Sequence, residues 1–315
     1  CHQGDFMDKT EKIWLNGKLV NWEDAKVHVL AHALNYGTGV FEGIRVYQTP
    51  KGMAIFRLKD HVQRMMDGCK MMGIDLVFDG KTYGFDDLCN AIKDVVRANG
   101  EMVDYVKPCV FLSGEEVGLN PVGVPVSMAI TCVHMGNYLG SGAAAGAKLI
   151  TSSWQRPDNL CGPAGAKVNG SYVASTLAKR EAVSQGANEA VMLNSVGHVA
   201  ECTGENIFMY YQGKIVTPAS AESILNGITR RSIIQIAQDM GYEVLETEVS
   251  RFMLMSSDEV WMTGTAAEIA PVTSLDGRPI GDGKIGKVAT EIHAKFHDIA
   301  TGKDLKYEDW LDYVN

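Results

Sequence analysis

A single lysine, Lys167, stands among small, uncharged residues in the segment GPAGAKVNGSYVAS (residues 162–175). A lysine picked at random is usually solvated, so a loop lysine ahead of a helix is the ordinary interpretation. A lysine kept partly away from water loses its proton more readily, and the neutral amine can form a Schiff base with an aldehyde. Lys167 is therefore either a surface residue or a nucleophile.

The aldehyde that best fits such a lysine is pyridoxal 5'-phosphate, which makes three further demands. It needs an anion beside its pyridine nitrogen, a donor for its phenolate oxygen, and a phosphate site. Glu201 and Glu205 compete for the pyridine nitrogen, and an exposed strand-end glutamate is the ordinary interpretation of either. Tyr172, five residues after Lys167, is the candidate donor, and its alternative role is that of a core tyrosine on the helix beginning there.

The candidate phosphate site is the segment LNGITRRSI (residues 225–233). Gly227 allows close approach of the backbone, and Thr229 opens a predicted helix whose free N–H groups can bind phosphate. Taken alone, an ordinary helix capped by Thr229 explains the segment better. A second cluster of donors is the Thr-Gly-Thr turn that begins at Thr263.

Other chemical motifs fail on their spacing. Gly37, Gly39 and Gly43 miss a dinucleotide-binding fingerprint by one residue, and no GxxxxGK[ST] phosphate loop occurs. His28 and His32 have no third ligand, so we interpret them as structural and expect no metal site. The sequence also contains no nucleophile elbow.

Periodicity and turn residues divide the first half of the chain into strands and helices. Asn16-Gly17 between two apolar runs predicts a hairpin. The second predicted helix ends at Asn99-Gly100, a stop signal. The predicted strands are residues 12–20, 40–49, 53–58, 105–113 and 125–134, and the predicted helices are residues 59–73 and 85–100.

The uncharged segment 136–147, rich in glycine and alanine, is expected to link two domains. Strands and helices alternate irregularly on both sides of it, which favours an α+β fold over one doubly wound sheet. We expect an N-terminal domain at 1–135 and a C-terminal domain at 148–315. After the linker we predict strands at 148–155, within 189–218, at 243–249 and at 259–263, and helices near 171–184, 229–240 and 287–299.

Composition excludes several classes of function. The 315 residues include 38 acidic and 29 basic ones, for a net charge of −9, which argues against nucleic acid as the main partner. Seven scattered cysteines without a CxxC motif predict reduced thiols and a cytoplasmic protein. No apolar run is long enough to cross a bilayer, so we expect no membrane partner.

Together these segments resemble the branched-chain amino acid aminotransferases, which are fold-type IV enzymes dependent on pyridoxal phosphate. The resemblance covers about residues 12–303. It implies a small N-terminal α/β domain, a larger C-terminal domain with a pseudo-barrel of strands, and a homodimer or an oligomer built from dimers. Its most specific segments are HALNYGTGVFEGIRVY (32–47), AKVNGSYVAS (166–175), ECTGENIF (201–208), LNGITRRSI (225–233) and TGTAAEIAPV (263–272).

The resemblance also implies a role for each site residue. Lys167 would carry the Schiff base and move the proton, and Glu201 rather than Glu205 would face the pyridine nitrogen. The other implied cofactor residues are Arg64 at the phosphate, Tyr172 at the phenolate oxygen, Leu225 against the ring, and Ile228, Thr229 and Thr265 in the phosphate site beside Gly227. The implied substrate residues are Tyr36, Phe41, Gly43 and Tyr105 along the pocket, and Thr265, Ala266 and Ala267 near the α-carboxylate. Tyr36 would serve the site of the neighbouring subunit.

Two positions depart from the family pattern. Lys107 replaces a common arginine, and Asn226 stands where proline is common. Arginine binds a carboxylate with two parallel hydrogen bonds, whereas lysine offers a point charge. Our hypothesis is that Lys107, together with Arg45, still binds the acidic substrate.

The expected function is transamination of leucine, isoleucine and valine with 2-oxoglutarate by a ping-pong mechanism. D-amino acid aminotransferases and aminodeoxychorismate lyases share the lysine and the glutamate, so they stay as alternatives. The segment FEGIR (41–45) and Tyr105 favour the branched-chain L-enzymes. The alternative from another class is a protein that only binds a nucleotide or an acidic metabolite, and such a protein would be colourless.

Overall fold

The computed structural model describes residues 8–136 and 145–314, which form two compact units. The first unit contains residues 8–136, 166–170 and 299–314, and the second contains 145–165 and 171–298. Most of the expected linker, 136–147, lies outside the described residues, and the expected domain boundaries stay a prediction. The segment 166–170, which carries Lys167, belongs to the first unit although both of its flanks belong to the second.

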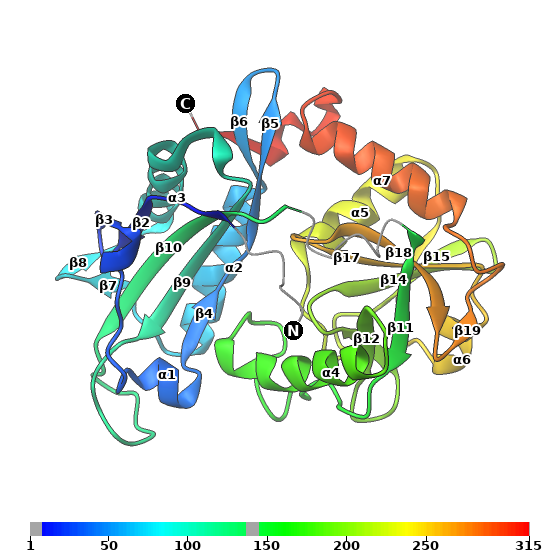
Figure 1. The fold of residues 1–315 in the computed structure, drawn as a ribbon, viewed down its shortest axis with the longest axis horizontal. Helices are drawn as coiled ribbons and strands as arrows, with labels where there is room; N and C mark the ends of the chain where they lie inside the picture. Colours follow the sequence, from blue (N-terminus) through cyan, green and yellow to red (C-terminus); the bar gives the residue numbers. More distant parts are fainter. Residues whose placement is uncertain (1–7, 137–144, 315) are drawn as a thin grey trace. The chain divides into compact units, whose positions relative to one another are not determined.

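A nine-stranded sheet forms the first unit (Figure 1). Its order is β20-β6-β5-β9-β10-β2-β3, with β1 beside β10 and β4 beside β9. Helices α2 and α3 bury residues such as Met65 and Ile92 in one core with strand residues such as Val106. The elements of this unit are β1 (Asp8–Lys9), β2 (Lys12–Leu15), β3 (Lys18–Asn21), α1 (His32–Tyr36), β4 (Gly39–Phe41), β5 (Ile44–Thr49), β6 (Gly52–Phe56), α2 (Leu58–Met71), β7 (Val77–Phe78), β8 (Lys81–Thr82), α3 (Phe85–Asn99), β9 (Tyr105–Leu112), β10 (Val126–His134) and β20 (Leu311–Tyr313).

Local sequence explains the turns of the first unit. Asn16 and Gly17 have φ values of 46° and 94°, the left-handed pair that a tight hairpin requires, and they join β2 to β3. The predicted strand 40–49 is interrupted between β4 and β5. At the interruption the backbone N–H of Glu42 donates to the Pro108 carbonyl, and the Glu42 side chain is buried against α2.

The second unit is built on another nine-stranded sheet, in the order β13-β12-β11-β18-β17-β14-β15-β16, with β19 beside β18. The sheet is mixed, because β11 pairs parallel with both β12 and β18 whereas β17 pairs antiparallel with both β14 and β18. Figure 1 shows it curled, with α4 and α5 packed against its strands. Its elements are β11 (Ala147–Thr151), α4 (Tyr172–Ser184), β12 (Glu189–Leu193), β13 (Val199–Cys202), β14 (Asn206–Tyr211), β15 (Lys214–Pro218), α5 (Ile228–Asp239), β16 (Val244–Thr247), α6 (Arg251–Met255), β17 (Glu259–Gly264), β18 (Glu268–Leu275), β19 (Arg278–Pro279) and α7 (Lys287–Ala300).

These sheets and helices confirm the α+β class that the sequence predicts. Across the two described ranges, no helix has both the length and the apolar character needed to cross a membrane.

Candidate active site

Lys167 is anchored to strand β4 of the first unit. Its carbonyl oxygen accepts a hydrogen bond from the Phe41 N–H at 3.0 Å, and the next residue, Val168, forms a bridge with Val40. The Lys167 Nζ lies 4.7 Å from the centre of the Phe41 ring, and the residue is half-buried. An ammonium over an aromatic face is held in place while its solvation is reduced. This contact fixes where the amine lies and does not by itself assign it a chemical role.

The predicted substrate residues of the first unit gather around the same strand. The Lys107 Nζ lies 5.2 Å from the centre of the Phe41 ring. The Tyr105 hydroxyl lies against Gly43, and a Cβ at this position would collide with it unless the tyrosine moved. Arg45 pairs with Asp104 at 3.4 Å. Tyr36 lies at the end of α1, and its hydroxyl accepts a hydrogen bond from Gly118.

Arg64, the predicted phosphate residue on α2, is held by a buried carboxylate. Glu42 accepts hydrogen bonds from Nε and Nη2 of Arg64, each at 2.7 Å, and its Oε2 is also 2.7 Å from Nδ1 of His61. Glu42 is 1% exposed and His61 2% exposed. The fork-to-fork geometry fixes the direction of the guanidinium group.

Charge and burial oppose each other in this cluster. Burial alone would raise the pKa of Glu42, but the charge of Arg64 and the hydrogen bonds from His61 and Arg64 outweigh it, and the pKa falls from 4.5 to about 2. Burial lowers the pKa of His61 below 6.5, against the raising effect of Glu42. Glu42 and Arg64 therefore remain an ion pair beside a neutral imidazole at neutral pH.

Replacing Glu42 with glutamine should reduce the free energy of unfolding by about 3 kcal/mol at pH 7, because Arg64 would lose its buried partner. In the wild type the stabilisation by Glu42 is complete above about pH 4.5 and is lost as the pH falls towards about 2. The difference between the two proteins should therefore shrink over that range. Urea unfolding at several pH values measures it, with the exposed Glu116→Gln as the control. An equal loss in both variants would contradict the assignment.

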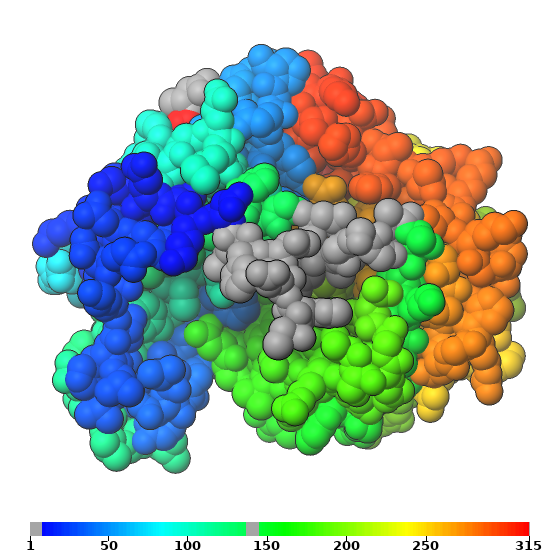
Figure 2. Space-filling model, viewed as in Figure 1, coloured from blue at the N-terminus to red at the C-terminus, as the bar shows by residue number. Residues whose placement is uncertain are grey.

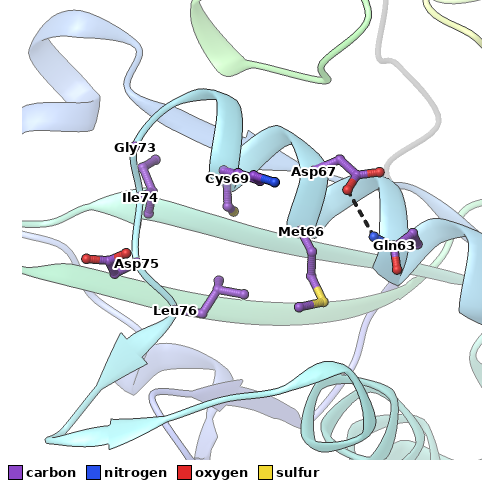
Figure 3. A pocket seen from close by; sticks show the side chains of 9 residues that line it. Gln63, Met66, Asp67, Cys69, Gly73, Ile74, Asp75 and Leu76 are labelled. Carbon is purple, nitrogen blue, oxygen red and sulfur yellow. Dashed lines mark hydrogen bonds between the residues drawn. The ribbon is translucent and has the colours of Figure 1, made fainter.

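A pocket of about 440 Å³ lies along another part of α2 and the turn after it (Figure 3). Its lining runs from Gln63 to Leu76 and includes Asp67, whose carboxylate accepts a hydrogen bond from Gln63 at 2.9 Å. The lining contains none of the predicted site residues.

In the second unit, Glu201 on β13 is buried within a ring of contacts. Its Oε2 accepts hydrogen bonds from Nδ2 of Asn206 at 2.9 Å and from the backbone N–H of Leu225 at 3.0 Å. Its Oε1 lies 2.7 Å from Nε of Arg156, an ion-pair distance, although that N–H is not aligned for a hydrogen bond. A carboxylate with a buried cation beside it can stay ionised and serve a protonated pyridine nitrogen.

The N-terminus of α5 follows directly after this ring. Gly227 is the N-cap residue and has no side chain with which to cap the helix, and Thr229 is buried in the first turn. The first N–H groups of the helix are therefore left for an external acceptor, and the helix dipole favours an anion there. The alternative in which Thr229 caps the helix is wrong, because the helix begins at Ile228 with Gly227 as its cap.

The remaining predicted residues of the second unit lie at turns and helix starts. Tyr172 is the first residue of α4 and is half-buried. Thr265, Ala266 and Ala267 form the turn between β17 and β18, and each is half-buried. The structure thus brings Glu201, Leu225 and the start of α5 into direct contact, whereas Lys167, Phe41 and Arg64 lie in the first unit.

Three buried residues of this geometry were not among the sequence candidates. Glu42 fixes Arg64, and Arg156 and Asn206 contact Glu201. Glu42 and Asn206 stand inside the quoted segments FEGIR and ECTGENIF. The sequence therefore drew attention to their positions but did not indicate which residues they contact. Nothing in the sequence near Arg156 pairs it with Glu201, which follows 45 residues later (201 − 156).

Within the described chain, only one group of side chains comes close enough to share a metal ion, and it consists of His198, Glu222 and Glu248. His198 Nδ1 and Glu222 Oε2 are 3.0 Å apart, and Asn194 donates a hydrogen bond to the same oxygen at 2.7 Å. These contacts account for the buried carboxylate of Glu222 without an ion.

Comparison with known proteins places the chain among enzymes. The family model described as amino-transferase class IV matches residues 39–275. The branched-chain-amino-acid aminotransferase of Escherichia coli (strain K12) is 41% identical over 309 residues, covering 98% of each chain. Two solved structures of a T.th. branched-chain amino acid aminotransferase are each 44% identical and cover 98% of this chain and 100% of theirs. One, complexed with N-(5'-phosphopyridoxyl)-L-glutamate, has a TM-score of 0.91, and the other, complexed with 4-methylvaleric acid, has 0.90. The chain belongs to the class IV aminotransferases and, within them, to the branched-chain amino acid aminotransferases.

Proposed function

We propose that the chain catalyses transamination of leucine, isoleucine and valine with 2-oxoglutarate, with pyridoxal 5'-phosphate as its cofactor. The single observation that carries this proposal is the contact of a buried carboxylate, Glu201, with the loop that leads into the uncapped N-terminus of α5. A pyridine nitrogen and a phosphate are recognised by these two kinds of group. Full-length relatives with the same activity support it.

The donor set fits this cofactor. The backbone at the start of α5 and Arg64 suit a phosphate, and Glu201 suits a protonated ring nitrogen. When bound, pyridoxal phosphate supplies an aldehyde that condenses with amines and a ring that withdraws electrons from the α-carbon. The residues proposed to hold it are Arg64, Tyr172, Glu201, Leu225, Gly227, Ile228, Thr229 and Thr265, with Lys167 as the amine.

Lys167 is proposed to take the α-proton of the amino acid and to return a proton later in the cycle. A positioned amine of this kind acts as general base and then as general acid. Its backbone is fixed to β4 and its Nζ lies over Phe41, so little reorganisation is needed before the proton moves. Glu201 is held in place by Arg156 and Asn206, and its negative charge is proposed to face the pyridine nitrogen of the cofactor.

The substrate pocket must accept an aliphatic side chain in one half of the reaction and a carboxylate in the other. Phe41, Tyr105 and Tyr36 are proposed to contact the aliphatic chain, and the turn of Thr265, Ala266 and Ala267 the α-carboxylate. A relative bound to 4-methylvaleric acid and one bound to a glutamate adduct support both uses. Lys107, beside Phe41, is proposed to attract the second carboxylate.

Replacing Lys107 with methionine should raise KM for 2-oxoglutarate about tenfold and leave KM for leucine within about twofold, since a charge–carboxylate contact is worth about 1–2 kcal/mol. Steady-state kinetics with each substrate varied in turn measures the change. Lys81→Met is the matched control, because Lys81 also lies over an aromatic ring, that of Tyr83, in the same unit. Equal losses for both substrates would refute the role of Lys107.

The test of the proposed function is an assay with purified protein. The holoenzyme should be yellow, and it should form glutamate from L-leucine and 2-oxoglutarate but not from D-leucine. A colourless protein that cannot be reconstituted would favour the plain binding protein. Activity with D-leucine alone would favour a D-amino acid aminotransferase.

We also propose that the protein is a homodimer, supported by an apolar surface on the first unit. Exposed apolar side chains cluster on α1, on the turn before it and on the loop of residues 113–125, where Tyr36 and Gly118 are hydrogen-bonded. Figure 2 shows these blue and teal segments together at one end of the unit. The exposed residues are Val27, Val29, Leu30, Leu34, Tyr36, Val117, Leu119 and Val122. A patch of this kind marks an interaction surface.

Replacing Leu34 with glutamate should convert the dimer to a monomer at micromolar concentration, because it places a charge in an apolar interface. Analytical ultracentrifugation measures the mass. Met71→Glu is the control, since Met71 and Leu34 are each 67% exposed. A dimer that survives the Leu34 substitution would place the interface elsewhere.

A cytoplasmic location is proposed as well. What supports it is that the described cysteines Cys69, Cys89, Cys109, Cys132, Cys161 and Cys202 are all free thiols, as expected in a reducing compartment.

A further inference from the structure

Asn206, the first residue of β14, is buried and donates two hydrogen bonds from its side-chain nitrogen. It is 5% exposed. Its Nδ2 donates one hydrogen bond to Glu201 Oε2 at 2.9 Å and another to the Leu225 carbonyl at 2.8 Å. The Leu225 N–H returns a hydrogen bond to the same Glu201 oxygen at 3.0 Å. Three residues from β13, β14 and the loop before α5 thus form a closed ring of hydrogen bonds.

The ring leaves little freedom to the Glu201 carboxylate. Oε2 has two donors, and Oε1 lies beside the buried guanidinium of Arg156. Losing the Asn206 hydrogen bonds would leave Glu201 Oε2 with the Leu225 N–H as its one remaining donor of this ring and would remove the donor to the Leu225 carbonyl, a cost because both oxygens lie in a site with little access for water. Rotation of the carboxylate or displacement of the loop would break the ring.

Asn206 also explains the glycine at the start of α5. Gly227 has φ −60° and ψ 139°, a conformation open to any residue, so its backbone does not require glycine. A Cβ at Gly227 would instead collide with Oδ1 of Asn206. One side of the Asn206 amide therefore holds the carboxylate, and the other fills the space at the helix cap.

We propose that Asn206 is a positioning residue that fixes the distance and direction between the Glu201 carboxylate and the N-terminus of α5. This inference rests on the proposed roles of these two groups at the ring nitrogen and at the phosphate of the cofactor. In this scheme Asn206 contacts neither the ring nitrogen nor the phosphate of the cofactor. It acts by holding Glu201 and Gly227, which are 26 residues apart in the sequence (227 − 201), in a fixed arrangement.

The test compares Asn206→Asp with Asn194→Asp. Asn194 is 4% exposed, lies in the same unit and also donates a hydrogen bond to a buried glutamate, Glu222, but it has no place in the proposed site. Asparagine and aspartate have the same shape, but a carboxylate at 206 can donate neither of these hydrogen bonds, and it adds negative charge beside Glu201. Asn206→Ser, which is neutral and keeps one donor, serves if the aspartate variant does not fold.

Two readouts separate positioning from mere stability. Equilibrium dialysis should show pyridoxal phosphate binding about ten- to a hundredfold more weakly to the Asn206 variants, the loss expected for one or two buried hydrogen bonds. The pH at which the absorption of the bound cofactor changes should shift as well. Asn194→Asp should lower the thermal midpoint to a similar degree and change neither readout.

A Glu201→Gln background distinguishes this inference from the function on which it rests. The absorption shift caused by Asn206→Asp should vanish in that background, because Asn206 acts on the ring nitrogen through Glu201. If Glu201→Gln alone changes neither absorption nor turnover, both the proposed role of Glu201 and this inference are wrong. If Glu201→Gln has its effect and the Asn206 variants match Asn194→Asp, only this inference is overturned.

Discussion

Lys167→Ala is expected to lower kcat for leucine by about a thousandfold or more, because the chain would lose the residue proposed as both its nucleophile and its general base. The protein should still fold, since the hydrogen bond between Lys167 and β4 uses the lysine's backbone carbonyl, and the side-chain contact with the Phe41 ring is the one that is lost. Single-turnover kinetics of the leucine half-reaction measures the loss. Lys81→Ala, which also removes a lysine lying over an aromatic ring, should leave the rate within about twofold.

Chemical labelling supplies an independent check on Lys167. Borohydride reduction of the holoenzyme should attach the cofactor to the peptide holding Lys167. A label on Lys107, the other lysine beside Phe41, would overturn the assignment of the nucleophile. So would substantial activity in Lys167→Ala.

Glu201→Gln is expected to have the second largest effect, a fall in kcat of about a hundredfold with little change in KM. A neutral amide cannot keep the ring nitrogen protonated, so negative charge at the α-carbon would be less well stabilised. The substitution also leaves Arg156 without its buried partner, so thermal unfolding must be measured beside the kinetics. The kinetic loss should persist well below the melting temperature.

Glu205→Gln is the matched control for Glu201. Glu205 is a buried glutamate of the same unit, 3% exposed against 5% for Glu201. Its carboxylate accepts a hydrogen bond from Gly204, whereas Glu201 holds Asn206 and the loop before α5. A larger kinetic loss in Glu205→Gln than in Glu201→Gln would reverse the assignment.

Local signals predicted much of the fold. The Asn16-Gly17 turn and the stop at Asn99-Gly100 appear where short-range rules place them, because each depends on backbone conformations that few residues adopt. Strand β18 (Glu268–Leu275) was not predicted, and it contains Pro271, a residue that is rare in the middle of a sheet. It pairs in parallel with β11, which is far away in the sequence, and antiparallel with β17. The pattern of apolar residues alone reveals neither pairing.

The candidate site was predictable in its types of residue but not in its partnerships. Lys167, Glu201 and Thr229 were candidates by residue type, but the choice of Glu201 over Glu205, and of Thr229 as part of a phosphate site, came from the family resemblance. Arg156 could not be chosen, because its pairing with Glu201 arises only when the segment after β11 folds against β13. Glu42 was quoted within FEGIR, yet its ion pair with Arg64 bridges 22 residues and two elements. Ion pairs between residues far apart in the chain cannot be predicted from one sequence alone.

The short segment 166–170 also constrains how the protein can be divided. It belongs to the first unit, yet it is flanked on both sides by the second, and residues 299–314 return to the first unit again. No single cut in the chain can therefore yield two complete halves. A fragment ending at residue 136 would lack the partner that Val168 provides for Val40. The chain passes from one unit to the other four times, after residues 136, 165, 170 and 298. Gene fusion or fragment complementation would therefore have to preserve four connections and not one.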